Sequence, residues 1–200
     1  MRQITDRFVE AVALAARLHR NQARKGSDVP YLSHLLRVAG LVIEFGADED
    51  TAIAAMLHDA VEDQGGLETA VQIRKQFGPR VERFVIGCSD SVTGNDQPKR
   101  PWRERKESMI ACIDDLDPET QLIIACDKLD NLRSTLKEYP QVGADLWKRF
   151  SGGRSGTLWY YRSMIDALRE AGGCPVLDEL EYTLNRLKQL IQEKEKNNEQ

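Results

Sequence analysis

Apolar residues recur along most of this chain at the three- and four-residue spacing of an amphipathic helix. In the first such segment Phe8, Val12 and Ala15 fall at helical spacing, Thr5 is a candidate N-cap and Gly26 a stop. No stretch alternates polar and apolar residues as a half-buried strand does. The pattern predicts helices within residues 5–26, 28–46, 47–66, 67–78, 79–92, 102–116, 118–139, 157–173 and from 176 onward.

Cap and turn residues mark where these helices begin and end. Ser33 is the expected N-cap of the second helix, and Pro118 suits the first turn of the helix at 118–139. The compositions of 93–101 and 151–156 predict loops, and the charged end of the last segment is expected to fray. Because there is also no internal repeat, we expect a single all-α domain.

Composition is that of a soluble globular protein and excludes some classes of function. Of 200 residues, 41% are hydrophobic and 30% are charged, and the net charge of −4 argues against a general nucleic-acid binder. No stretch approaches the roughly 20 apolar residues that span a bilayer. Arg2, Asp6 and Arg7 interrupt any N-terminal signal peptide. We therefore expect a cytoplasmic protein without nucleic-acid or membrane partners.

The cysteines are scattered and form no C-x-x-C pair. We expect them to be small buried apolar residues in a reducing cytosol, with a shared metal site or a disulfide pair as the alternative. They are Cys88, Cys112, Cys126 and Cys174.

A cluster of ionisable residues, HDAVED, interrupts an apolar stretch at residues 58–63. His58 and Glu62 are four apart, as are Asp59 and Asp63, so each pair falls on one side of a helix. Such residues can simply point into water at a helix end. However, His58 and Asp59 directly follow the apolar run AIAAML, and buried charges are normally paired or coordinate a metal. The pattern therefore favours a divalent cation.

Two further polar residues lie among apolar residues of the predicted helices. His34 lies early in an amphipathic helix, where a packed or capped histidine is the ordinary interpretation. Asp127 interrupts LIIACDKL, where a solvated residue on a polar face is the ordinary interpretation. Ile123, Ile124 and Leu129 nevertheless crowd its surroundings with hydrophobic side chains.

These residues resemble a known family. His34, the His58–Asp59 pair and Asp127 follow the order H…HD…D of the HD-domain phosphohydrolases. HDAVED is similar to the HD-x-V-E-D motif in the hydrolase domain of RelA/SpoT homologues, and DKLDNLRS resembles their D-[KR]-L-x-N-[LM]-R segment. YLSH resembles P-Y-x-x-H and FGPRV resembles F-G-x-x-V. The resemblance runs from about residue 5 to 170 and is close to the small, single-domain alarmone hydrolases.

The resemblance implies an HD helical bundle at residues 1–175, followed by a C-terminal helix and charged tail at 176–200. It also implies one divalent metal ion, most often Mn²⁺ in this family, with Fe²⁺ or Zn²⁺ as alternatives. Such an ion polarises a phosphoryl oxygen and lowers the pKa of bound water. Glu62 and Asp63 would then orient or deprotonate that water. The implied ligands are His34, His58, Asp59 and Asp127.

An anionic substrate requires positive charge nearby. The family resemblance assigns Arg24 and Lys25 to phosphate and Asn131 to the nucleoside. Lys106 belongs to the basic stretch KRPWRERK, for which a solubilising surface is the alternative. Tyr160 lies where related enzymes carry a tyrosine near the ligand, although core packing is expected for Tyr160 or its neighbour.

The function that the resemblance implies is removal of the 3′-pyrophosphate from (p)ppGpp or (p)ppApp. The alternatives are an HD-type nucleotidase acting on a 5′-nucleotide, a deoxynucleotide or NADPH, and a non-catalytic nucleotide-binding module. Asp130 departs from the usual His or Tyr and is expected to add negative charge near a polyphosphate pocket. The threonine that often follows E-D is also absent. The amphipathic C-terminal helix suits either self-association or docking on its own core.

Overall fold

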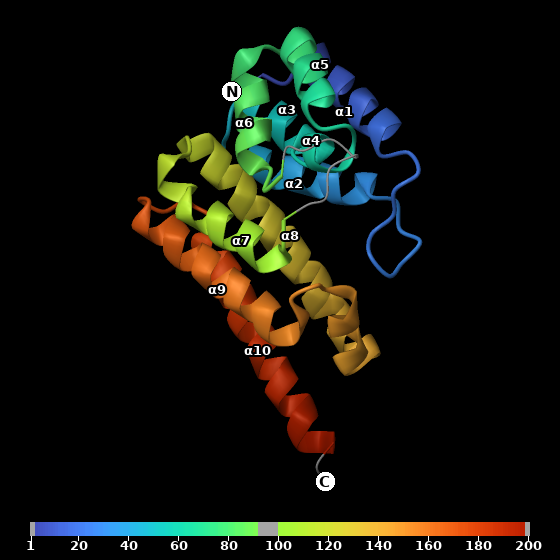
Figure 1. The fold of residues 1–200 in the computed structure, drawn as a ribbon, viewed down its shortest axis with the longest axis vertical. Helices are drawn as coiled ribbons and strands as arrows, with labels where there is room; N and C mark the ends of the chain where they lie inside the picture. Colours follow the sequence, from blue (N-terminus) through green and yellow to red (C-terminus); the bar gives the residue numbers. More distant parts are fainter. Residues whose placement is uncertain (1–2, 92–99, 199–200) are drawn as a thin grey trace.

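The fold is all-α, as the sequence predicts. The computed structural model describes residues 3–91 and 100–198, and within these residues the only strand-like pairing is a single bridge between Ala23 and Pro30. Figure 1 shows the arrangement. The elements in order are α1 (Asp6–Leu18), α2 (Leu32–Glu44), α3 (Glu49–Leu57), α4 (Ala60–Asp63), α5 (Leu67–Phe77), α6 (Pro79–Cys88), α7 (Trp102–Ala111), η1 (Ile113–Asp115), α8 (Pro118–Val142), η2 (Gly143–Arg149), α9 (Gly153–Glu170) and α10 (Leu177–Asn198).

The apolar helix α3 forms the centre of the N-terminal half. Every residue from Thr51 to Leu57 is buried, because α1, α2, α6 and α8 all pack against it. Asp48 caps its N-terminus by accepting hydrogen bonds from the backbone N–H and the hydroxyl of Thr51. The residues directly after α3 are therefore held at the edge of the core.

The long helix α8 joins the two halves of the molecule (Figure 1). Its N-terminal part packs on α2, α3 and α6, and its remaining length packs on α9 and α10. The apolar face of α10, which includes Leu180, Leu184, Leu187 and Ile191, is buried in this docking. In the structure the C-terminal helix therefore docks on the core of its own chain, which is one of the two expected alternatives. Self-association and the domain boundary at residue 175 stay predictions.

The charged end of α10 differs from the sequence prediction, because the helix continues to Asn198 instead of fraying. Lys194 donates a hydrogen bond to the carbonyl oxygen of Pro140 at 2.5 Å, and Arg154 forms an ion pair with Glu195. These contacts to α8 and α9 hold the polar end against the rest of the fold.

Several expected helix boundaries are also wrong. Helix α1 ends at Leu18, well before the expected stop at Gly26. The segment 47–66 is two helices, with a break at His58 and Asp59. Helix α2 begins at Leu32, and within residues 3–91 and 100–198 the buried hydroxyl of Ser33 has no hydrogen-bond partner, so Ser33 is no cap. Helix α9 begins at Gly153, inside the expected loop 151–156.

The glycines of that expected loop have a packing role. A Cβ added at Gly152 would lie 2.5 Å from the ring of Trp102, and one at Gly156 would lie 3.2 Å from it. The absence of side chains at both positions lets α7 and α9 pack closely. Most of the other expected loop, 93–101, lies outside the described residues, as does Lys99 of the basic stretch.

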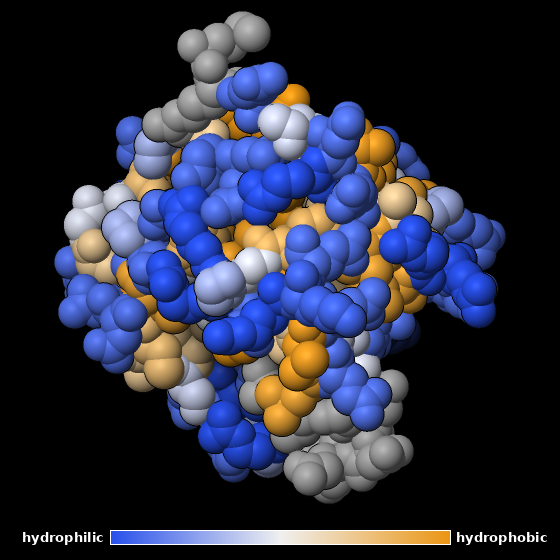
Figure 2. Space-filling view, turned by 90° about the horizontal axis from the view of Figure 1, so that it is seen from above, coloured by the Kyte–Doolittle hydropathy of each residue, from blue (hydrophilic) through white to orange (hydrophobic). Residues whose placement is uncertain are grey.

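The surface is predominantly polar on the face seen in Figure 2, where hydrophobic residues appear in small separate groups. None of the described helices combines the length and apolar content needed to cross a membrane. The cysteines are all free thiols. Cys126 is buried as expected, Cys88 and Cys174 are partly buried, and Cys112 is exposed, so the prediction of burial is wrong for Cys112.

Candidate metal centre

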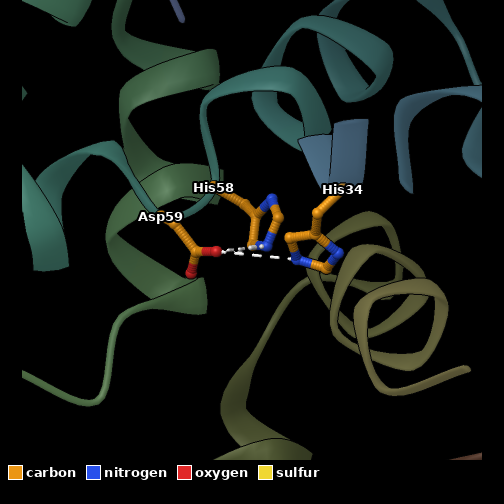
Figure 3. A group of neighbouring side chains, drawn as sticks. All are labelled: His34, His58 and Asp59. Carbon is orange, nitrogen blue, oxygen red and sulfur yellow. Dashed lines mark ion pairs between the residues drawn. The ribbon is translucent and has the colours of Figure 1, made fainter. Parts of the chain in front are cut away.

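Two histidines and two aspartates from three separate segments converge at the end of α3. Figure 3 shows the rings of His34 and His58 and the carboxylate of Asp59 directed toward one another. The potential ligand atoms of these three residues all lie within 4.8 Å of one another. Asp127 on α8 completes the group, because its Oδ1 lies 3.1 Å from His34 Nε2 and 3.6 Å from His58 Nε2.

The break between α3 and α4 positions the His58–Asp59 pair. His58 Nδ1 contacts the carbonyl oxygen of Ala55 at 2.8 Å, so the ring folds back on the buried helix. Its Nε2 lies 3.0 Å from Asp59 Oδ2, which is also 3.7 Å from His34 Nε2. One carboxylate oxygen therefore faces both imidazoles.

The donor set fits a divalent cation. The Nε2 atoms of His34 and His58 are buried and have no hydrogen-bond partner among the described residues. A carbonyl can only accept, so His58 Nδ1 carries a hydrogen and Nε2 of the neutral ring presents a lone pair. Two such lone pairs facing carboxylate oxygens repel them unless a proton or a metal ion lies between. Two imidazoles with two carboxylates suit Mn²⁺, Fe²⁺ or Zn²⁺.

Electrostatics at the site show the same need for positive charge. Burial alone would lower the pKa of His58, but Asp59 and Asp127 outweigh it and raise that pKa well above the usual value. Burial would raise the pKa of Asp59, yet His58 holds it below the usual range. The pKa of Asp127 is also well below its usual value, because Lys128 and the two histidines outweigh burial. Both carboxylates are thus kept anionic.

Two side chains that sequence reasoning did not single out support the acidic residues. The hydroxyl of Tyr31 donates to Asp59 Oδ2 at 2.5 Å, and the ammonium of Lys128 donates to Asp127 Oδ2 at 2.5 Å. Both residues stand inside recognised motifs, YLSH and DKLDNLRS, so a signal was present. What the sequence does not give is which acidic residue each one contacts.

The predicted acid/base pair lies beside this cluster, on the wall of a pocket. Glu62 and Asp63 both line the pocket together with Asp59 and Asp127. Gln22 donates a hydrogen bond to Asp63 Oδ2 at 2.8 Å. Glu62 Oε1 lies 3.7 Å from a guanidinium nitrogen of Arg105.

The pocket has a volume of about 400 Å³ and extends from the cluster along one face of α8. Asp127, Asn131, Ser134, Thr135 and Glu138 line it at helical spacing. At a rise of about 1.5 Å per residue, this face is roughly 16 Å long. All of the predicted substrate contacts line the same pocket, namely Arg24, Lys25, Lys106, Asn131 and Tyr160.

Arg24 and Asn131 form a chain of hydrogen bonds to the cluster. Arg24 donates to Asn131 Oδ1 at 2.8 Å, and Asn131 donates to Asp127 Oδ1 at 2.5 Å. Residues from the loop after α1 and from α8 are thus linked. Gly26 makes this loop arrangement possible, because it has a φ of +75° and the side chain of Arg149 lies where its Cβ would be.

Lys106 is held on another wall of the pocket. Its ammonium lies 2.6 Å from Asp90 Oδ2 and 4.9 Å from the ring centroid of Tyr160. Asp90, whose side chain is 2% exposed, also pairs with Arg105. Burial works to raise the pKa of Asp90, but Lys106 and Arg105 outweigh it and lower that pKa.

The expectation for Asp130 is wrong. Asp130 does not line the pocket; its carboxylate is buried behind His34, where Oδ2 lies 2.7 Å from His34 Nδ1. Arg37 neutralises it through Nε at 2.5 Å from Oδ1. Helical spacing puts Asp130 near Asp127, but on α8 the two side chains lie on opposite edges of the same imidazole.

Similar proteins of known sequence include guanosine-3′,5′-bis(diphosphate) 3′-pyrophosphohydrolases. The Homo sapiens MESH1 enzyme of that name is 33% identical over 67% of this chain and 72% of its own length. The Aquifex aeolicus enzyme is 33% identical over 66% of this chain. The chain spans only 18% of that protein and 14% of the GTP pyrophosphokinase of Streptomyces coelicolor, which is 36% identical over the matched residues.

Solved structures are similar over most of the fold. A metazoan orthologue of SpoT that hydrolyses ppGpp superposes with a TM-score of 0.70 and 28% identity, covering 95% of this chain and 98% of its own. A protein from Listeria monocytogenes superposes with a TM-score of 0.63 and 30% identity, covering 80% of this chain and 99% of its own.

The HD domain sequence profile matches residues 11–158. Because this match covers more than half of the chain and includes the His34, His58, Asp59 and Asp127 cluster, the protein belongs to the HD domain family.

Proposed function

We propose that this protein is a metal-dependent hydrolase that removes the 3′-pyrophosphate of guanosine 3′,5′-bis(diphosphate). The observation that carries the proposal is the pair of buried, unpartnered Nε2 atoms of His34 and His58 facing Asp59 and Asp127 at one end of a pocket. The names of the human and Aquifex aeolicus relatives support this substrate over other nucleotides.

The metal would be held by His34 Nε2, His58 Nε2, Asp59 and Asp127, with Mn²⁺ as the proposed ion. When bound, such an ion supplies Lewis-acid polarisation of a phosphoryl oxygen and lowers the pKa of water. The chain's own part is to keep these four groups in place. Ala55 and Asp130 bind the Nδ1 atoms of the two rings, and Tyr31 binds Asp59.

Glu62 and Asp63 are the proposed acid/base groups. A general acid or base must lie within hydrogen-bond reach of the proton that it transfers, directly or through one water molecule. Both residues line the pocket wall next to the cluster, and Gln22 fixes the carboxylate of Asp63. In the reaction, the oxygen of water bonds to the 3′-phosphorus, the bond from that phosphorus to the ribose 3′-oxygen breaks, and a proton passes to the 3′-oxygen.

The walls of the pocket supply the positive charge that a bis(diphosphate) needs. Arg24 and Lys25 come from the loop before α2, Lys106 from α7 and Lys128 from α8. Each charge-assisted hydrogen bond to a phosphate would contribute about 1.5–3 kcal/mol. Asn131 lies between Arg24 and the metal-ligand cluster, where its amide would orient the nucleoside.

A nucleotide panel tests the proposal. Purified protein with Mn²⁺ should release pyrophosphate from guanosine 3′,5′-bis(diphosphate) and leave guanosine 5′-diphosphate. The adenosine analogue, 5′-mononucleotides, deoxynucleotides and NADPH are the comparison substrates, with pyrophosphate and orthophosphate measured separately. Release of orthophosphate from one of the other nucleotides, without activity on 3′-pyrophosphorylated ones, would refute the substrate and retain the metal site. Nucleotide binding without any product would favour the non-catalytic module.

A further inference from the structure

Asp130 forms a buried ionic contact behind the candidate metal centre, away from the pocket. Its side chain is 4% exposed, and its Oδ2 lies 2.7 Å from His34 Nδ1. Arg37 binds both carboxylate oxygens, through Nε to Oδ1 at 2.5 Å and through Nη2 to Oδ2 at 3.1 Å. The Arg37 side chain is 47% exposed, so a charge at the surface neutralises a carboxylate inside the fold.

Helical spacing on two facing helices builds this contact. His34 and Arg37 are three residues apart on α2, and Asp127 and Asp130 are three residues apart on α8, so each pair lies on one helix face. Helices α2 and α8 pack together. The His34 ring consequently lies between two carboxylates, with Asp127 at its Nε2 edge and Asp130 at its Nδ1 edge.

The contact with Asp130 determines which nitrogen of His34 is available to a metal. A carboxylate only accepts hydrogen bonds, and of the two carboxylates beside His34 it is Asp130 that is hydrogen-bonded to the ring, at Nδ1. This contact favours the hydrogen on Nδ1 and leaves the lone pair on Nε2. That lone pair points to the cluster of Asp59 and Asp127, where no residue in the described part of the chain forms a hydrogen bond with Nε2. His58 differs, because its Nδ1 contacts the neutral carbonyl of Ala55.

We propose that Asp130, held in place by Arg37, is a positioning residue that fixes the orientation and tautomer of His34 and strengthens it as a metal ligand. The proposal rests on the metal site of the proposed function. An anionic acceptor at Nδ1 polarises the imidazole more than a carbonyl does, so Asp130 should support His34 more strongly than Ala55 supports His58. Contacts of this kind typically change metal affinity by about 10- to 100-fold.

The alternative is that the Arg37–Asp130 pair only stabilises the fold. An ion pair with one buried partner is weak grounds for a purely stabilising role, because desolvation of the Asp130 carboxylate offsets its attraction to Arg37. The two roles differ in what they predict. A structural pair affects the unfolding temperature of the metal-free protein, whereas a positioning pair affects the affinity for metal in protein that is still folded.

The test measures the dissociation constant of Mn²⁺ for metal-free protein, with the thermal unfolding of each metal-free variant recorded alongside. Asp130→Asn keeps an acceptor oxygen and removes the charge, and Asp130→Ala removes both. We expect Mn²⁺ binding about 10-fold weaker for Asp130→Asn and about 100-fold weaker for Asp130→Ala. Arg37→Gln, at a half-exposed position, should fold and give a loss smaller than that of Asp130→Ala.

Asp50→Asn is the matched control. Asp50 is a partly buried carboxylate that pairs with Arg7 at 2.8 Å and Arg80 at 3.4 Å in the first turn of α3, outside the pocket. This variant should lose stability and keep the wild-type Mn²⁺ affinity. Wild-type affinity in folded Asp130→Asn and Asp130→Ala would overturn the inference, even if both unfold at lower temperature, and would leave the proposed function standing. Failure of the wild-type protein to bind Mn²⁺ would overturn both.

Discussion

Arg24 and Asn131 should act as a coupled pair in substrate turnover. The sequence gives them separate roles, but the structure joins them by a 2.8 Å hydrogen bond from Arg24 Nη2 to Asn131 Oδ1. Removing either side chain removes this bond and leaves the other residue displaced. We therefore expect Arg24→Ala and Asn131→Ala each to lower kcat/KM, and the double variant to lose less than the sum of the two.

The magnitude follows from the charge on Arg24. A lost charge-assisted contact costs about 1.5–3 kcal/mol, which corresponds to a loss of about 10- to 150-fold in kcat/KM for Arg24→Ala. Since residues that share a hydrogen bond are coupled by about 0.5–3 kcal/mol, the double variant should recover at least about 0.5 kcal/mol relative to additivity.

The assay is pyrophosphate release from guanosine 3′,5′-bis(diphosphate) at saturating Mn²⁺, with the bound metal measured in every variant because Asn131 also contacts Asp127. Lys25→Ala combined with Asn131→Ala is the control cycle, since the exposed Lys25 side chain should contribute independently. Strict additivity for Arg24 and Asn131, or a loss below about threefold for Arg24→Ala, would refute the reasoning.

Other consequences of the structure can be measured separately. Glu62→Gln together with Asp63→Asn should lower kcat by at least about 10²-fold while metal content stays unchanged; full activity would reduce the pair to a solvated helix end. Asp90→Asn should lower the free energy of unfolding at pH 7 by about 1.5–3 kcal/mol. Because the pKa of Asp90 is lowered in the fold, this stabilisation is present above the unfolded-state value of about 3.9 and is lost as the pH falls through the folded-state pKa. Urea titrations from pH 7 to pH 2 should show the two proteins converging, and a constant difference would contradict this. Gly26→Ala should raise KM several-fold by displacing Arg149, which also lines the pocket, whereas an unchanged KM in a folded variant would show that the loop tolerates the shift.

The all-α fold is predictable from the sequence, but several helix boundaries are not. Helical periodicity predicts an all-α fold, and the family resemblance groups His34, His58 and Asp127 as metal ligands. The residues alone left a packed histidine and a solvated aspartate as the ordinary interpretations of His34 and Asp127. Periodicity could not predict the break at His58 and Asp59, since an apolar run continues directly into it.

Contacts between helices were beyond the sequence. Asp130 shares a helix face with Asp127, but only the packing of α2 on α8 determines that it faces His34 and not the pocket. Arg37 carries no motif, and its role depends entirely on that packing. Local composition was also misleading at Gly156, which lies inside α9, where the absence of a side chain accommodates Trp102.

The most direct test of the proposed metal-dependent 3′-pyrophosphohydrolase activity is a Mn²⁺ titration of metal-free protein that follows pyrophosphate release from guanosine 3′,5′-bis(diphosphate). The structure has one cluster of this kind in its described part, built on His34, His58 and Asp59. We expect no release without metal, a rise that saturates near one equivalent of tightly bound Mn²⁺, and no recovery in His58→Ala at the same concentrations. Pyrophosphate release that persists in excess chelator, or that His58→Ala supports at the wild-type rate, would contradict the account.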